Sequence, residues 1–103
     1  MNILKIDTRD SKNIIIRLET DKKVFKEKTF VDRNKTQSTL PAVEKLLKQA
    51  GIGVQDIREI KVENVGGSFT GLRVGVAIAN ALSFSLGVKV NDKNLGEIES
   101  PQY

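Results

Sequence analysis

Residues 68–87 have the sequence SFTGLRVGVAIANALSFSLG, in which Arg73 is the one charged side chain. Ser68 is a suitable N-cap and Gly87 a suitable end, so this stretch predicts a helix over residues 69–86. At about 100° per residue, only Arg73 and Asn80 give this helix a polar stripe. A helix so apolar needs cover on more than one side. A domain of 103 residues has no second layer to supply that cover, so the sequence predicts a partner protein.

Two rows of residues on this helix predict its contacts. Val74, Ile78 and Leu82 recur four apart and are expected to lie on the domain's own sheet. The second row consists of small residues that let another helix approach closely, and its members are Gly71, Gly75, Ala79 and Ser83. The approaching helix belongs either to a partner or to the same domain, and both packings can hold.

Short alternating segments on both sides of this helix are separated by turn residues, which is typical of strands. Polar turns are expected at residues 9–12 and 20–23. The expected strands are residues 3–8, 13–19, 24–31, 57–63 and 88–90, with Ile60 and Val62 inward in the fourth. The first three strands form a meander.

An amphipathic helix is predicted between the third and fourth strands. Its apolar positions recur at helical spacing, and they are Leu40, Val43, Leu46, Leu47 and Ala50. Thr36, Ser38 or Thr39 is the expected cap, Pro41 fits the first turn, and Gly51 with Gly53 ends the helix. The order βββαβαβ predicts a single α/β domain with a mixed five-stranded sheet and two main helices. Residues 96–103 carry too little apolar content to predict order.

The composition excludes several kinds of chemistry. The chain has neither cysteine nor histidine, which removes disulfides, thiolate metal sites and imidazole bases. The N-terminus lacks the features of a secretory signal, and the most apolar stretch, residues 73–89, is shorter than the roughly 20 residues of a membrane span. We therefore expect a cytoplasmic protein that is not bound to a membrane.

The net charge of +4 includes a basic segment that could attract nucleic acid, formed by Lys22, Lys23, Lys26, Lys28, Arg33 and Lys35. No aromatic stacking platform accompanies these residues. The sequence therefore favours a solvated strand face over a nucleic-acid site.

Residues 67–75, GSFTGLRVG, follow a predicted strand and open the apolar helix, and they closely resemble the signature of the TsaB (YeaZ) family. Residues 3–8, ILKIDT, are similar to the opening strand of that family, and residues 37–47 are similar to its first helix. The resemblance extends from Ile3 to about Asp92. It implies an actin-like, ribonuclease-H-like domain that corresponds to the first of the family's two domains, so the cleft between domains cannot form within residues 1–103.

The resemblance also implies a function in making threonylcarbamoyladenosine on tRNA, as an accessory subunit that is not itself an enzyme. The expected partners are the catalytic subunit TsaD, further pathway proteins and a second copy of the chain, and tRNA is contacted only within the complex. ATP or ADP and metal are expected on TsaD or at the subunit boundary. The implied partner interface comprises Leu40, Val43, Leu47, Phe69, Gly71, Leu72, Gly75, Val76, Ala79 and Ser83.

Asp7 and Thr8 end the first strand, where actin-like folds keep a carboxylate that faces metal or phosphate. A turn or cap residue is the favoured alternative. Residues 66–71, GGSFTG, have the glycines of a phosphate loop but lack its lysine, so a tight turn is favoured there. The alternative function is half of an ATP-binding phosphotransferase that needs a second domain in trans, with Asp7 and Thr8 as its nucleotide contacts.

Overall fold

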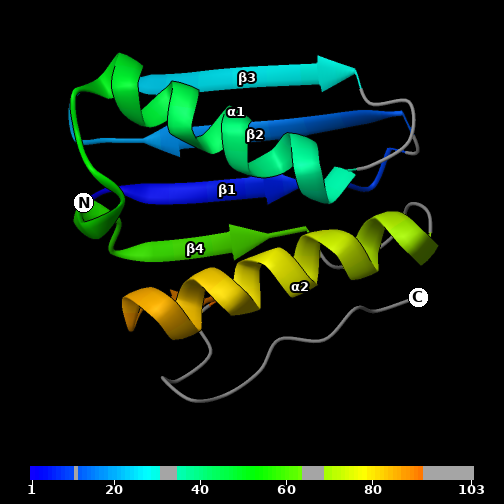
Figure 1. The fold of residues 1–103 in the computed structure, drawn as a ribbon. Helices are drawn as coiled ribbons and strands as arrows, with labels where there is room; N and C mark the ends of the chain where they lie inside the picture. Colours follow the sequence, from blue (N-terminus) through cyan, green and yellow to red (C-terminus); the bar gives the residue numbers. More distant parts are fainter. Residues whose placement is uncertain (11, 31–34, 64–68, 92–103) are drawn as a thin grey trace.

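The computed structural model describes residues 1–10, 12–30, 35–63 and 69–91. In these ranges the elements follow one another in the predicted order βββαβαβ (Figure 1). They are β1 (Ile3–Asp7), β2 (Asn13–Glu19), β3 (Val24–Phe30), α1 (Lys35–Ala50), a 3-10 turn η1 (Val54–Asp56), β4 (Glu59–Val62), α2 (Phe69–Leu86) and β5 (Lys89–Val90). Val31 and Ser68, which the sequence placed in a strand and at a cap, lie outside the described residues.

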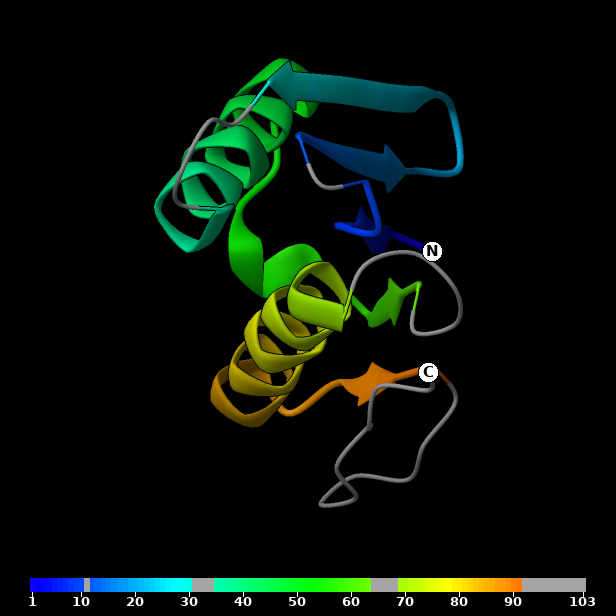
Figure 2. The same ribbon diagram turned by 90° about the vertical axis from the view of Figure 1, so that its right-hand side faces the viewer.

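The five strands form one mixed sheet in the order β3-β2-β1-β4-β5. Short turns join β1, β2 and β3 as antiparallel neighbours, whereas β4 runs parallel to β1 and to β5. Parallel neighbours need long crossovers, and α1 and α2 supply them. Both helices lie on the same side of the sheet (Figure 2). The opposite side, called the open face below, carries no helix in the described residues.

Strand alternation decides which side chains the helices cover. Leu4 and Ile6 of β1 and Ile14, Ile16 and Leu18 of β2 are buried, and the residues between them point to the open face. The prediction that Ile60 and Val62 face inward is confirmed, because both are buried in the same core. Removing these side chains from water is the main stabilising contribution to the fold.

The start of α1 corrects the sequence prediction. The helix begins at Lys35, so Thr36, Ser38 and Thr39 lie within it and do not cap it. Thr39 is fully buried, and Pro41 lies beyond the first turn. Proline has no N–H and costs an interior helix about 3 kcal/mol, which is why the sequence favoured a later start. Burial of Ala42, Val43, Leu46 and Leu47 on the sheet offsets this cost.

The helix ends agree with the predictions. Gly51 follows α1 with φ +72° and Gly87 follows α2 with φ +68°, and both angles lie in the left-handed region that glycine adopts without strain. Strand β4 (Glu59–Val62) is shorter than the predicted residues 57–63, and Ile57 instead caps the turn η1. In that turn the Gly53 N–H donates to the Asp56 carboxylate at 2.9 Å.

Candidate functional site

The inner face of α2 packs on the sheet more completely than its sequence predicts. Ile78 is buried and Leu82 is partly buried against the core, as predicted. Val76 and Ala79 are buried as well. A Cβ atom placed on Gly75 would clash with Thr8 Oγ1 and would lie 3.4 Å from Val62 Cγ2. At Gly75, therefore, α2 lies close to Thr8, which follows β1, and to Val62 at the end of β4.

This packing corrects the predicted interface. The small-residue row lies only about 100° from the row of Ile78 and Leu82, and its members Gly75 and Ala79 are buried in the domain as well. Gly75, Val76 and Ala79 of α2 and Val43 and Leu47 of α1 consequently pack inside the domain and do not face a partner. The side chain of Val74, which was expected on the sheet, lies outside the described part. The Ser83 hydroxyl donates to the Val88 carbonyl within the same chain. Leu40 is 46% exposed, and the side chains of Phe69 and Leu72 and the surroundings of Gly71 lie outside the described part.

The outward side of α2 is formed by another row, namely Arg73, Ala77, Ala81 and Phe84. All four are exposed, and the Phe84 side chain has 92% of its surface in solvent. Ala77, Ala81 and Phe84 are called the outer face of α2 below. The sequence prediction missed them. A signal was available, because successive steps of four, four and three residues from the charged Arg73 place them on the same side of the helix as Arg73. Although α2 is apolar, no helix in the described ranges has the length and hydropathy of a membrane span.

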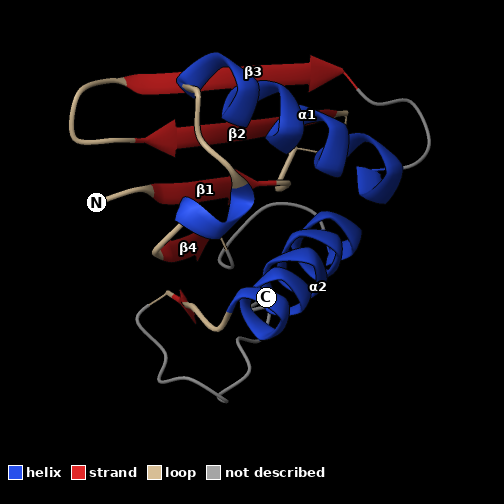
Figure 3. Ribbon diagram, turned by 60° about the vertical axis from the view of Figure 1, so that its left-hand side comes forward, coloured by secondary structure: helices blue, strands red, loops and turns tan. Residues whose placement is uncertain are grey.

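Helix α1 presents a different surface on the same side of the sheet (Figure 3). Leu40 and Pro41 are exposed near its beginning, and Glu44, Lys45 and Lys48 are exposed farther along. Lys45 Nζ lies 3.2 Å from Glu27 Oε2 of β3. The outward side of α1 thus carries three charged side chains after Pro41, whereas that of α2 carries no charge after Arg73.

The end of β1 holds Asp7 in a turn closed by Arg9. Asp7 Oδ1 accepts hydrogen bonds from the Arg9 backbone N–H at 3.0 Å and from Arg9 Nε at 3.1 Å, and Oδ2 accepts one from Nη2 at 3.0 Å. Burial acts to raise the pKa of Asp7, but the hydrogen bonds and positive charge of Arg9 together hold it below the ordinary value of 3.8. The hydrogen bonds and negative charge of Asp7 in turn raise the pKa of Arg9. Asp7 is therefore an ionised carboxylate with a fixed partner.

A hollow of about 510 Å³ opens on the open face beside Asp7, and its lining includes Lys5, Arg9, Arg17 and Lys61. Thr8 does not line it, because Thr8 is fully buried and directed toward Gly75 of α2. The structure thus separates the two predicted nucleotide contacts, with Asp7 at the hollow and Thr8 in the core. Within the described residues, no group of three or more acidic, histidine or cysteine side chains lies close enough to share a metal ion.

One rim of the hollow is held by an unusual pairing. Asn91 has φ 51°, and its side-chain amide donates to the Val62 carbonyl and accepts from the Val62 N–H, both at 2.8 Å. The amide thereby continues the pairing of β4 where β5 ends. Asparagine suits this position because it tolerates the left-handed conformation.

Comparisons with known proteins agree with this fold. Residues 24–92 match the family described as "TsaD: tRNA N6-adenosine threonylcarbamoyltransferase". The chain is 34% identical to the tRNA threonylcarbamoyladenosine biosynthesis protein TsaB of Bacillus subtilis, over 88% of this chain and 40% of that protein. It is 35% identical to the protein of the same name in Escherichia coli, over 81% of this chain and 36% of that protein. The structure of YeaZ from Pseudomonas aeruginosa superposes with a TM-score of 0.81 at 25% identity, over 90% of this chain and 43% of that one. The chain thus spans about two fifths of the length of these relatives.

Proposed function

Because the chain belongs to the TsaB (YeaZ) family and has its actin-like α/β fold, we propose that it acts in tRNA threonylcarbamoyladenosine biosynthesis as a non-catalytic assembly subunit. In this proposal it binds a TsaD-type catalytic subunit through the side of the domain that carries α1 and α2. Support for the pathway comes from the names of the relatives. Support for the mode of action comes from the surface of α2.

The outer face of α2 is the observation that carries the proposal. Phe84 is almost fully exposed in the chain by itself, and burying a side chain of this kind stabilises a complex by roughly 1.5 to 3 kcal/mol. Ala81 lies one turn before it and Ala77 two turns before it, and small residues let a second helix approach closely. Aromatic side chains, phenylalanine among them, are enriched in the cores of protein interfaces. Leu40 of α1 adds an exposed apolar side chain on the same side of the sheet.

ATP or ADP and metal are assigned in this proposal to the TsaD-type partner or to the boundary between the subunits. Asp7 and Glu63 both line the hollow, and Asp7 already accepts three hydrogen bonds from Arg9. Binding a metal ion at the Asp7 carboxylate would require Arg9 to move. This chain's own contribution is then the positioning of its partner.

The matched variants Phe84→Asp and Phe30→Asp test the proposal. Both phenylalanines are exposed, but Phe84 lies on α2 and Phe30 lies on β3, on the open face. The measurement is titration calorimetry of the chain against a purified TsaD homologue. We expect wild type and Phe30→Asp to bind with equal affinity, and Phe84→Asp to bind at least tenfold more weakly.

Circular dichroism of each variant reports whether it is folded. Equal affinity of the folded Phe84→Asp variant and wild type would refute the assigned surface. Absence of any TsaD binding by wild type would refute the function itself.

A further inference from the structure

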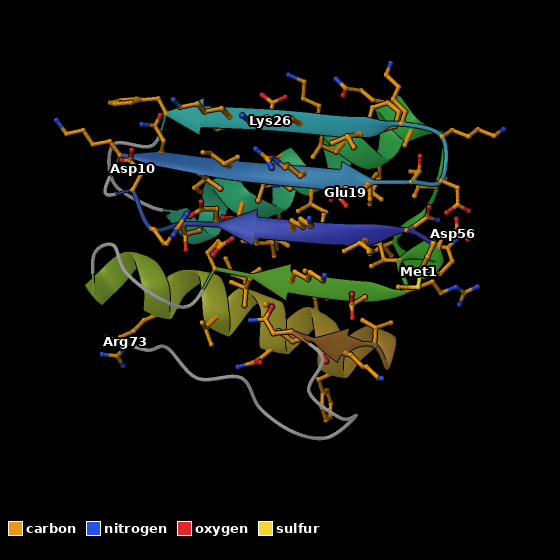
Figure 4. The ribbon with its side chains drawn as sticks, turned by 180° about the vertical axis from the view of Figure 1, so that it is seen from behind. Met1, Asp10, Glu19, Lys26, Asp56 and Arg73 are labelled. Atoms are coloured by element: carbon orange, nitrogen blue, oxygen red, sulfur yellow. The ribbon has the colours of Figure 1, made fainter. Side chains whose placement is uncertain are left out.

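The open face of the sheet carries an ordered row of positive charge. Cross-strand register sets Lys26 of β3 opposite Arg17 of β2, Arg17 opposite Lys5 of β1, and Lys5 opposite Lys61 of β4. Residues directly opposite each other project from the same face, so these four cations form one line across four strands. They are called the basic row below. Figure 4 views the sheet from this side and shows Lys26 on β3 and Glu19 on β2.

This arrangement opposes folding stability, because like charges directly opposite each other destabilise a sheet. Two members are partly compensated, since Lys5 Nζ lies 2.7 Å from Glu19 Oε2 and Lys61 Nζ lies 3.9 Å from Glu59 Oε1. Arg17 and Lys26 have no carboxylate within 4.0 Å among the described residues. Lys28 of β3 and Lys89 of β5 add further cations to the same face, next to the row. The basic row therefore presents four cations in one line to an anionic ligand.

The shape of the face distinguishes among anionic ligands. Strands lie about 4.8 Å apart, so the basic row extends over about 14 Å. Its members Lys5, Arg17 and Lys61 line the hollow of about 510 Å³. Arg9 lines it too but is paired with the carboxylates Asp7 and Glu63, so the basic row supplies the uncompensated positive charge there. A line of cations that crosses a hollowed face suits a chain of phosphates, whereas a bilayer presents a flat surface.

We propose that the open face binds the phosphate backbone of RNA through the basic row, independently of sequence. This surface lies on the opposite side of the sheet from α1 and α2, so the chain can hold RNA and a protein partner at once. The basic residues in the sequence were expected to form a solvated strand face. Lys26 becomes part of a binding surface in this proposal because strand pairing aligns it with Arg17, Lys5 and Lys61, which belong to other strands.

The test measures fluorescence anisotropy of a labelled, unmodified tRNA transcript with the whole chain at 50 to 300 mM NaCl. Four phosphate contacts from the basic row, at about 0.7 to 0.9 each, predict a slope of roughly −3 for the logarithm of the binding constant against the logarithm of the salt concentration. The double variant Arg17→Gln/Lys26→Gln should lower the slope by roughly 1.5 and weaken binding at 50 mM NaCl at least tenfold. The control Lys45→Gln/Lys48→Gln removes the same charge from α1 and should leave binding within about twofold.

Thermal melting supplies a second readout. Because like charges are removed, the Arg17→Gln/Lys26→Gln variant should melt no lower than wild type. Should that double variant fail to fold, the single variant Lys26→Gln on the edge strand still has to lower the slope by about 0.7.

Equal loss of tRNA binding in the α1 control would overturn the proposal, because the effect would then be one of net charge. The proposal is also wrong if wild type prefers poly-glutamate, or vesicles of phosphatidylcholine and phosphatidylserine, to tRNA. No TsaD homologue is present in this assay, so its result is separate from that of the proposed function.

Discussion

Substitution of Gly75 by alanine tests the packing of α2 against the sheet. The added Cβ would clash with Thr8 Oγ1 and would lie 3.4 Å from both Thr8 Cβ and Val62 Cγ2. Thr8 is fully buried, so its hydroxyl has little room to move. Overpacking of this kind costs about 1 to 3 kcal/mol, and the better helix propensity of alanine returns about 1 kcal/mol. We expect a net loss of up to about 2 kcal/mol, which corresponds to a decrease in Tm of at most roughly 8 to 16 °C for a domain of this size.

A double-mutant cycle with Thr8→Ala isolates this contact. Urea unfolding monitored by circular dichroism gives the free energy of unfolding of wild type, Gly75→Ala, Thr8→Ala and the double variant. With the threonine hydroxyl removed, alanine at position 75 should stabilise the protein, so the two substitutions should couple favourably by about 1 kcal/mol or more. If Gly75→Ala alone stabilises the protein by about 1 kcal/mol with no coupling, Gly75 faces away from the sheet and the packing described above is wrong.

Three further predictions concern the pH response, the association and the chemistry of the chain. The pKa of Asp7 is lowered on folding, so the ionised carboxylate stabilises the fold fully above pH 3.8, the ordinary pKa. This stabilisation is lost as the pH falls through the lower pKa of the folded state. Asp7→Asn should therefore weaken the pH dependence of the free energy of unfolding across that range. At high concentration the chain should self-associate through the outer face of α2. Sedimentation velocity should then show a dimer for wild type and a monomer for Phe84→Asp. A wild-type monomer at all concentrations would contradict this. The chain alone should hydrolyse no ATP above background. ATP turnover that Asp7→Ala abolishes, or micromolar ATP binding measured by calorimetry, would instead favour the alternative function as half of an ATP-binding phosphotransferase.

Local patterns were sufficient to predict the strands and the ends of the helices. Strand β2 has the predicted bounds, because Ile14, Ile16 and Leu18 alternate with more polar residues between two clear turns. The beginning of α1 was missed because Pro41 is a strong local signal, and the burial that overrides it depends on tertiary contacts.

The candidate surfaces were predicted less well, because they depend on which elements meet. The sequence shows that α2 has one polar stripe but not how wide a face the sheet covers, so Gly75 and Ala79 were assigned outward. Arg17, Lys5 and Lys61 are far apart in the chain and become neighbours only through strand register. A parallel pairing such as β1 with β4 leaves no local mark in the sequence.

The mixed topology also implies an order of assembly. The antiparallel strands β1, β2 and β3 are joined by short turns, so they pair with little loss of loop entropy. The contact of β1 with β4 closes a much longer loop, and β5 adds only two residues to that edge. Pairings across longer loops form more slowly, and an edge held by fewer contacts opens at lower free energy. The unit of β4, α2 and β5 should therefore join the meander late, and its amide hydrogens should exchange with solvent before those of β1 and β2. Since α2 belongs to this unit, a partner bound to its outer face would slow that exchange most.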